Sequence, residues 1–130
     1  MKIYYINTDL ELESPEDLTP IVNEFGESVF NLYNGEGRGH YLATFESNHN
    51  SGSPDAVIQF LCGLVESFEP EERRLWDQCY SRIFDIGYEG GTHRQSYTDE
   101  IRPETLSKIA ALNASIRITV YPMDTDSSET

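Results

Sequence analysis

The sequence predicts a single α+β domain over residues 1–122, with a mostly antiparallel sheet and helices packed on one face of it. Three observations indicate this class. Segments in which apolar residues alternate, as in strands, are interleaved with segments in which they recur at helical spacing. Serine–proline and glycine-rich breaks separate the two kinds of segment. The 130 residues, of which 38% are hydrophobic, suit one domain with one core.

Residues 2–13 predict the first strand. Ile3 and Tyr5 alternate with their neighbours in its first half, and Leu10 and Leu12 do so in its second half. Because the alternation slips between the two halves, we expect a bulge or bend near residues 7–9.

A short helix is expected to follow at once. Ser14 suits the N-cap, Pro15 suits the first helical position, and the two acids that follow favour the positive end of the helix dipole. Apolar residues then recur at helical spacing to Phe25, and Gly26 can end the helix in the left-handed conformation.

Two strands joined by a glycine-rich turn are expected next, over residues 27–34 and 40–45. The first has apolar residues in both registers, which is typical of a strand inside a sheet that is covered on at least part of both sides. Residues 35–39, Gly-Glu-Gly-Arg-Gly, predict the tip of a hairpin. A phosphate-binding loop is disfavoured there, because a strand follows in place of a helix and Glu36 would repel an anion.

The clearest helix signal begins at Ser53, where serine, proline and aspartate repeat the earlier pattern. Apolar residues then occupy one wide face of a helix up to Phe68. The break at residues 69–72, Glu-Pro-Glu-Glu, ends this helix and opens a shorter one with Leu75 and Trp76 in its apolar stripe.

The C-terminal part predicts four elements and a tail. The elements are a strand over residues 83–88, a weaker strand over 94–98, a helix opened by Arg102-Pro103 and a last strand over 115–121. Residues 123–130 are polar and acidic, and we expect a disordered tail.

The expected order of elements is therefore β-α-β-β-α-(α)-β-β-α-β. Its start has the split β-α-β, or ferredoxin-like, pattern. A C-terminal β-β-α-β unit would extend the same sheet, with the helices on one face.

The charge balance restricts the kind of partner. The chain has 23 acidic against 9 basic residues, a formal net charge of −14. Such a field repels phosphate backbones and anionic lipids, so we expect no nucleic acid and no membrane partner, and a basic protein is favoured. The alternative is that the acidity only keeps the protein in solution.

The chain has no segment approaching the roughly 20 apolar residues that a membrane span needs. Its first residues lack the apolar core of a signal peptide. Two cysteines do not make a disulfide framework. These features predict a cytoplasmic protein, and no cofactor is expected.

Residue types that carry chemistry are present, but no known motif combines them. Cys62 and Cys79 lie in apolar helical stripes, which favours core packing over a nucleophile. His40 has no metal-ligand spacing beside it. We therefore predict no catalytic residue and no metal ligand. The alternative is a small metal-dependent or hydrolytic enzyme with a loop site near His49 and His93.

Tyrosines and acids together favour a protein-binding surface, because rigid aromatic side chains are typical anchors of interfaces. The alternative for each tyrosine is that it covers a face of the sheet. The residues expected to bind the partner lie in the hairpin and around the strand at 83–88: Tyr33, Glu36, Arg38, Tyr41, Tyr88, Glu89 and Tyr97.

Residues 82–88, Arg-Ile-Phe-Asp-Ile-Gly-Tyr, are followed by Arg-Pro-Glu-Thr-Leu at 102–106 and Ile-Arg-Ile-Thr-Val-Tyr-Pro at 116–122. This last third of the chain resembles a bacterial family known only as a domain of unknown function. The resemblance implies an α+β fold and a bacterial or phage source, and it brings no catalytic residues. Small acidic proteins of this kind also resemble immunity or inhibitor proteins, which block a toxic or basic partner.

The sequence thus favours a non-enzymatic, acidic protein-binding module of immunity, inhibitor or adaptor type that engages a basic protein partner. The enzyme with a loop site is the second hypothesis. A third is a homodimer that pairs exposed sheet edges across a two-fold axis.

Overall fold

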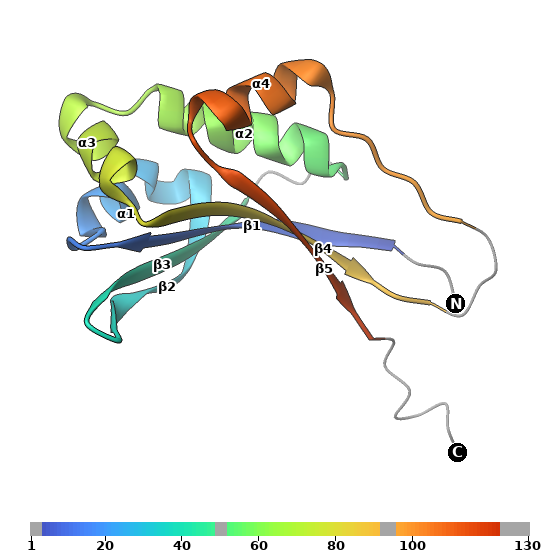
Figure 1. The fold of residues 1–130 in the computed structure, drawn as a ribbon, viewed down its shortest axis with the longest axis horizontal. Helices are drawn as coiled ribbons and strands as arrows, with labels where there is room; N and C mark the ends of the chain where they lie inside the picture. The colour runs from blue at the N-terminus through green and yellow to red at the C-terminus, as the bar shows by residue number, and fades with distance from the viewer. Residues whose placement is uncertain (1–3, 49–51, 92–95, 123–130) are drawn as a thin grey trace.

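The computed structural model describes residues 4–48, 52–91 and 96–122. They form a five-stranded sheet with four α-helices on one side of it (Figure 1). In chain order the elements are β1 (Tyr4–Ser14), α1 (Thr19–Phe25), a 3₁₀ turn (Gly26–Ser28), β2 (Val29–Gly37), β3 (His40–Ser47), α2 (Pro54–Glu66), α3 (Pro70–Gln78), β4 (Ser81–Glu89), α4 (Pro103–Ala111) and β5 (Ser115–Tyr121).

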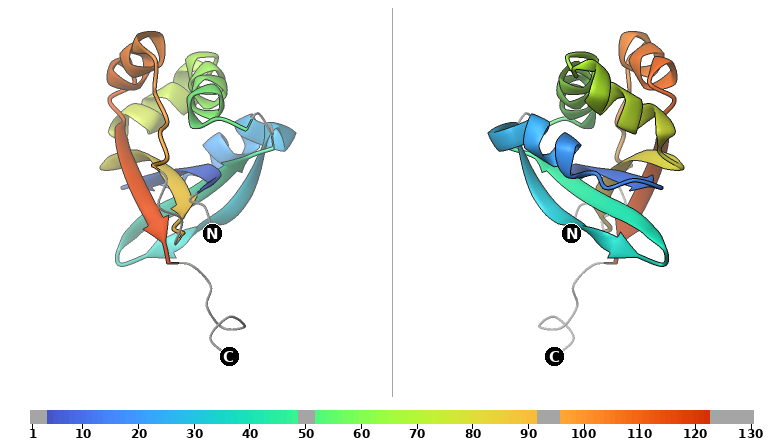
Figure 2. Two further views of the ribbon diagram at one scale, coloured as in Figure 1. Left: turned by 90° about the vertical axis from the view of Figure 1, so that its right-hand side faces the viewer. Right: turned by 90° about the vertical axis from the view of Figure 1, so that its left-hand side faces the viewer.

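The strand order in the sheet is β2-β3-β1-β4-β5. The first four of these strands are antiparallel to their neighbours, and β5 is parallel to β4. β1 and β2 are therefore parallel with β3 between them, which is the split β-α-β arrangement. The side views in Figure 2 show the helices gathered on one face. The predicted α+β class, mostly antiparallel sheet and ferredoxin-like start are confirmed.

β1 is the central strand, and it carries the expected irregularity. Its register against β4 shifts between Tyr5 and Asn7, slightly earlier than predicted. Beyond the shift, Leu10 and Leu12 point under the helices and are buried, as their alternation indicates.

The predicted start of the first helix at Ser14 is wrong. Ser14 is the last residue of β1, and its hydroxyl accepts a hydrogen bond from the backbone N–H of Glu16 at 3.0 Å, which makes a turn. α1 begins at Thr19, whose backbone N–H donates to the Asp17 carboxylate at 2.9 Å. Short polar side chains therefore turn the backbone here before the helix can begin. The expected end at Phe25 is confirmed.

β2 and β3 form the expected hairpin, but its tip is tighter than predicted. β2 continues to Gly37, so residues 35–37 pair with β3 and are not part of a loop. The turn consists of Arg38 and Gly39, whose φ values of 59° and 86° are both positive, as a type I′ turn requires.

The expectation that residues 27–34 form a strand inside the sheet, covered on at least part of both sides, is wrong. β2 is an edge strand, and its side chains Phe30, Leu32 and Tyr33 are 58%, 51% and 49% exposed. Apolar residues occupy both registers because the pairing with β3 shifts between Asn31 and Tyr33. These side chains belong to the surface of the protein.

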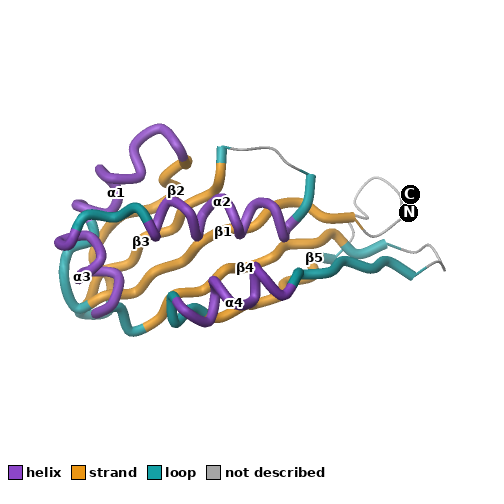
Figure 3. Tube along the Cα trace, turned by 90° about the horizontal axis from the view of Figure 1, so that it is seen from above, coloured by secondary structure: helices purple, strands orange, loops and turns teal. Residues whose placement is uncertain are grey.

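α2 and α3 are confirmed where the sequence places them. The Ser53 hydroxyl accepts a hydrogen bond from the backbone N–H of Ala56 at 3.3 Å and so caps α2. Leu75 and Trp76 of α3 are buried against the rest of the core. Figure 3 shows α2 lying along the middle of the sheet and α4 along its β4–β5 side.

Replacing the capping serine tests this assignment. Ser53→Ala should lower the free energy of unfolding by about 1 kcal/mol, because an N–H at the start of α2 loses its acceptor. Ser107→Ala is a matched control, since Ser107 is exposed within α4 and caps no helix start. Urea unfolding of the two variants should separate them, and equal stabilities would contradict the role of Ser53.

The weaker strand expected over residues 94–98 is wrong where it is described, because residues 96–98 are not in a strand, and 94–95 lie outside the described residues. Side chains hold this segment instead. The rings of Tyr88 and Tyr97 are 5.6 Å apart, and the Tyr88 hydroxyl donates to Asp99 at 2.9 Å. The C-terminal extension after β4 is therefore one helix and one strand. The expected tail, 123–130, lies outside the described residues.

The core lies between the sheet and the helices, and every layer contributes to it. Among its fully buried side chains are Leu10 and Leu12 of β1, Phe45 of β3, Phe84 of β4, Ile58 and Leu61 of α2, and Trp76 of α3. Burial of these large side chains is the main stabilising contribution to the fold.

Candidate protein-interaction surface

One face of the sheet carries none of the described helices (Figure 1). Successive side chains of a strand point to opposite faces, and Leu10 and Leu12 point toward the helices. The intervening residues of β1, Asp9, Glu11 and Glu13, therefore point to the helix-free face. The central strand thus presents a row of carboxylates on this face.

Neighbouring strands extend the row. Asp9 lies opposite Glu46 on β3 and opposite Asp85 on β4. We call Asp9, Glu11, Glu13, Glu46 and Asp85 the acidic face. Like charges directly opposite each other destabilise a sheet, so this row costs folding stability that a cation could recover.

Arg117 of β5 supplies such a cation to part of the acidic face. Its guanidinium donates to Glu11 at 2.8 Å and to Asp85 at 3.2 Å. The Thr119 hydroxyl also donates to Asp85, at 2.7 Å. The hydrogen bond to Glu11 is the main cause that raises the pKa of Arg117 above its usual value. Glu11 and Asp85 are thus compensated within the chain.

Asp9 and Glu46 are less well compensated. Glu46 accepts a hydrogen bond from the side-chain amide of Asn7 at 3.0 Å. The Oδ1 atom of Asp9 is buried and has no hydrogen-bond partner among the described residues. Desolvation, followed by the charges of Glu46, Asp85 and Glu11, raises the pKa of Asp9 to about 6. Asp9 and Glu46 are therefore two neighbouring carboxylates that no cation in the described part of the chain compensates.

The raised pKa predicts a pH-dependent effect of Asp9→Asn. The folded chain binds the proton of Asp9 more tightly than the unfolded chain, so the stability that Asp9 contributes is present at low pH and is lost as the pH rises through about 6. Asparagine does not ionise. The variant should therefore match the wild type below about pH 4 and exceed its free energy of unfolding by about 1 kcal/mol above pH 7, a value reduced for solvent screening.

Urea unfolding of both proteins across this pH range measures the difference, and NMR titration of the Asp9 carboxyl carbon gives an independent value. A difference in stability that stays constant with pH would contradict the assignment.

Exposed apolar side chains surround the acidic face. Tyr4 and Ile6 lie at one end of β1, Phe30 and Tyr33 lie on β2, and Tyr121 ends β5. On the same face, a groove of about 300 Å³ is lined by Glu11, Tyr33, Leu42, Ile83 and Arg117, among others. A charged centre with aromatic and aliphatic side chains around it is the composition of a protein-binding surface.

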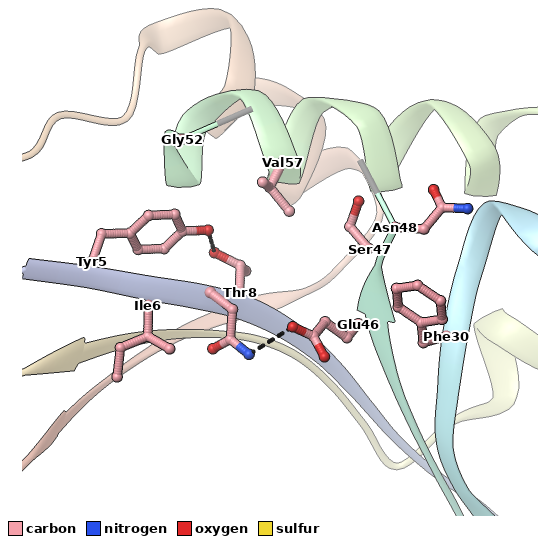
Figure 4. A pocket seen from close by; sticks show the side chains of 10 residues that line it. Tyr5, Ile6, Thr8, Phe30, Glu46, Ser47, Asn48, Gly52 and Val57 are labelled. Atoms are coloured by element: carbon pink, nitrogen blue, oxygen red, sulfur yellow. Dashed lines mark hydrogen bonds between the residues drawn. The ribbon is translucent and has the colours of Figure 1, made fainter. Parts of the chain in front are cut away.

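A second hollow, of about 310 Å³, lies where β1 extends beyond the end of β3 (Figure 4). The Tyr5 and Thr8 hydroxyls are hydrogen bonded at 2.7 Å on its helix side, and Ile6 points the other way. Glu46 is the one carboxylate among the ten described residues that line it. The described residues that line the hollow therefore include no pair of acids, and the hollow adjoins the acidic face through Glu46.

The two thiols are part of the core. Cys62 and Cys79 are free and buried, and burial raises the pKa of Cys62 to about 12 and that of Cys79 to about 11. Neither thiol forms a thiolate near neutral pH, and the thiolate is the reactive species. The predicted core role of both cysteines matches these positions.

Histidines do not form a described site. His40 contacts the Glu13 carboxylate, and its ring packs edge-on against Tyr80 at 5.9 Å. Within residues 4–48, 52–91 and 96–122, no group of three or more histidine, cysteine or acidic residues is placed to hold a metal ion. His49 and His93 lie outside the described residues, so the loop site near them stays a prediction.

Six of the seven residues predicted to bind a partner fall at opposite ends of the sheet. Tyr41 pairs with Ser14 and Glu89 pairs with Tyr4, so the two groups lie at opposite ends of β1. The span is about 33 Å at 3.3 Å per residue. Glu36, Arg38 and Tyr41 are in the hairpin, whereas Tyr88, Glu89 and Tyr97 are at the far end.

Two of the seven predicted residues belong to the helix-free face. Tyr33 lines its groove, and Glu89 lies at its end, where the Tyr4 hydroxyl donates to it. Tyr88 and Tyr97 pack together on the helix side, where Tyr88 also contacts Tyr5. The predicted set is therefore not a single surface.

Sequence reasoning missed the acidic face itself. In β1 the buried Leu10 and Leu12 alternate with Asp9, Glu11 and Glu13, so the sequence alone could have predicted that these three acids share one face. The acids that lie opposite them on β3 and β4 could not be predicted, because the pairing of strands depends on the strand order.

No protein-family model, no curated protein and no solved structure matches this chain. The resemblance of the last third to a bacterial family therefore stays a prediction. Among the described residues, no helix has the length and apolar character to cross a membrane.

Proposed function

We propose that this protein is a non-enzymatic binding module, of immunity, inhibitor or adaptor type, whose acidic face engages a basic segment of a protein partner. The observation that carries the proposal is the pair Asp9 and Glu46, which no cation among the described residues compensates and which lies beside a pair that Arg117 does compensate.

Arg117 shows how a cation fits on this face. Its guanidinium bridges carboxylates on two neighbouring strands, Glu11 and Asp85. Asp9 and Glu46 likewise lie opposite each other on neighbouring strands. An arginine of the partner would lie between these two carboxylates as Arg117 lies between Glu11 and Asp85, and charge-assisted bonds of this kind are strong.

The surrounding apolar side chains supply the rest of the contact. Phe30 and Tyr33 on β2 and Tyr121 on β5 are exposed on either side of the acidic face. Aromatic side chains at an interface exclude water from a central charge pair, which strengthens that pair. The net charge of −14 adds long-range attraction of a basic partner.

Location and source belong to the same proposal. A cytoplasmic protein of bacterial or phage origin is supported by the two-cysteine composition and by the resemblance of residues 82–122.

Affinity capture with matched variants tests the proposal. The acidic-face variant Asp9→Asn/Glu46→Gln removes two charges, and the control Glu24→Gln/Glu69→Gln removes two exposed charges from the helical layer. Immobilised wild type and control should retain the same basic protein from a lysate of the source organism, moderate salt should release it, and the acidic-face variant should lose it. Identical retention on all three columns, or retention indifferent to salt, would contradict the proposal.

A further inference from the structure

The second edge of the sheet is formed by β5, and no described element protects it. The seven residues Ser115–Tyr121 pair with β4 on one side, and no described strand pairs with their other side. β5 has no proline, no lysine and no register shift against β4. Such devices normally prevent an edge strand from pairing with another chain.

The other edge is protected in these terms. β2 has a register shift between Asn31 and Tyr33 and carries Glu36. The Asn31 side-chain amide also donates to the carbonyls of Tyr33 at 2.8 Å and Thr44 at 3.2 Å, so it occupies acceptors near the shift. The edge at β5 can therefore pair with an additional strand more easily than the edge at β2.

β5 also exposes an apolar stripe. Ile118 and Val120 are 64% and 59% exposed, and Ile116 lies beside them on the same side of the strand. By register they share the helix-side face with Phe84 and Ile86 of β4, but they lie beyond the cover of the helices. Leu106, on the preceding helix α4, is exposed as well.

Charge decides which occupant this edge accepts. β5 has no acidic residue although the chain has 23, and its one charged side chain, Arg117, is paired with Glu11 and Asp85. Because this one positive charge is balanced within the chain and β5 has no acidic residue, the free edge of β5 does not select a basic partner. It is compatible with β5 of a second copy even though each copy is strongly acidic.

We infer that β5 is a dimerisation edge, at which β5 of a second copy pairs antiparallel across a two-fold axis to form one ten-stranded sheet. The inference goes beyond the proposed function, because it concerns a different surface. With the axis at Ile118, Ile116 lies opposite Val120 of the second copy, and Arg117 lies opposite its Thr119. Apolar pairs then meet across the interface, and no like charges lie directly opposite each other.

The geometry has a consequence for the acidic face. A two-fold axis perpendicular to the sheet leaves the helices of both copies on one side, so both acidic faces lie on the other side. A dimer would therefore present two basic-segment sites to the same partner or to two partners, and linked sites raise the overall affinity.

Sedimentation of the purified full chain over a range from low micromolar to several hundred micromolar tests the inference. The wild type should show a mass that rises from 14.8 kDa for the monomer toward twice that value. Higher salt should favour the dimer because it screens the repulsion between acidic copies, whereas it should weaken binding of a basic partner. The opposite salt dependences distinguish failure of this inference from failure of the proposed function.

Two matched substitutions identify the edge. Ile118→Lys on β5 should leave the protein monomeric at every concentration, and Leu32→Lys on β2 should dimerise as the wild type does. Both side chains are exposed, so circular dichroism should show both variants folded. Backbone amides of β5 in the wild type should also exchange more slowly at high protein concentration, which requires no variant. A wild type that is monomeric throughout, or a dimer equally affected by both substitutions, would overturn the inference.

Discussion

Replacing Asp9 by Asn and Glu46 by Gln together should weaken binding of a short arginine-rich peptide by roughly tenfold at low salt, the equivalent of about 1.4 kcal/mol. The two carboxylates lie opposite each other on β1 and β3, and the Oδ1 atom of Asp9 is buried without a hydrogen-bond partner among the described residues. Both replacements keep the shape of the side chain, and the amide oxygen introduced by Glu46→Gln can still accept the bond from Asn7. The loss therefore reports charge. Isothermal titration calorimetry measures it.

The control removes the same charge elsewhere. Glu24→Gln/Glu69→Gln lowers the net charge equally, but both residues are exposed in the helical layer. If the peptide responds only to the overall field, both double variants weaken its binding to the same extent. If the acidic face is the binding surface, the control changes the affinity by less than the acidic-face variant at every salt concentration. Equal losses would count against the role of this face.

Trp76→Ala should lower the free energy of unfolding by about 3–5 kcal/mol, a large fraction of the stability of a domain this size. Trp76 is completely buried at the contact of α3 with the rest of the core. Its ring packs edge-on against Phe68, and its indole N–H donates to the Leu112 carbonyl at 2.9 Å. The substitution leaves a cavity and removes the donor from a buried carbonyl.

Urea unfolding of three variants separates the contribution of packing from that of the hydrogen bond. Trp76→Phe keeps most of the packing and loses the hydrogen bond, so its stability should lie between those of the wild type and Trp76→Ala. Tyr80→Ala, at a residue 65% exposed just after α3, should cost far less. A small loss for Trp76→Ala would mean that α3 contributes little to holding the helices on the sheet.

The alternation of β1 shows how far local sequence can reach. Leu10 and Leu12 predict a buried face, and the same alternation places Asp9, Glu11 and Glu13 opposite it. The sequence does not say which strands flank β1. Glu46 lies 37 positions from Asp9 and Asp85 lies 76, and the three meet because β1 lies between β3 and β4. A cluster of charges that depends on the strand order therefore cannot be predicted from local sequence patterns.

Two serine–proline pairs show the limit of local signals for helix starts. Ser53 and Ser14 are both followed by proline, and only Ser53 caps a helix. At Ser14 the preceding strand ends within the sheet, and the hydroxyl closes a turn with Glu16. The same chemical group stabilises a turn or a helix start, and the tertiary position of the segment decides between them.

Exposure of β2 also depends on long-range structure. The apolar residues of both registers, among them Phe30, Leu32 and Tyr33, indicate burial when they are considered alone. The strand order puts β2 at the edge, and the register shift turns part of this apolar surface outward. The aromatic side chains of β2 adjoin the acidic face. The prediction of burial therefore failed at a surface that has the composition of a protein-binding site.

The most direct test is an amide NMR map of the protein titrated with the arginine-rich peptide. We predict chemical-shift changes on β1, β3 and β4 that centre on Asp9 and Glu46, with small changes along α2 and α4. Changes spread over the exposed acids of the helices, with none centred on the helix-free face, would contradict binding by the acidic face.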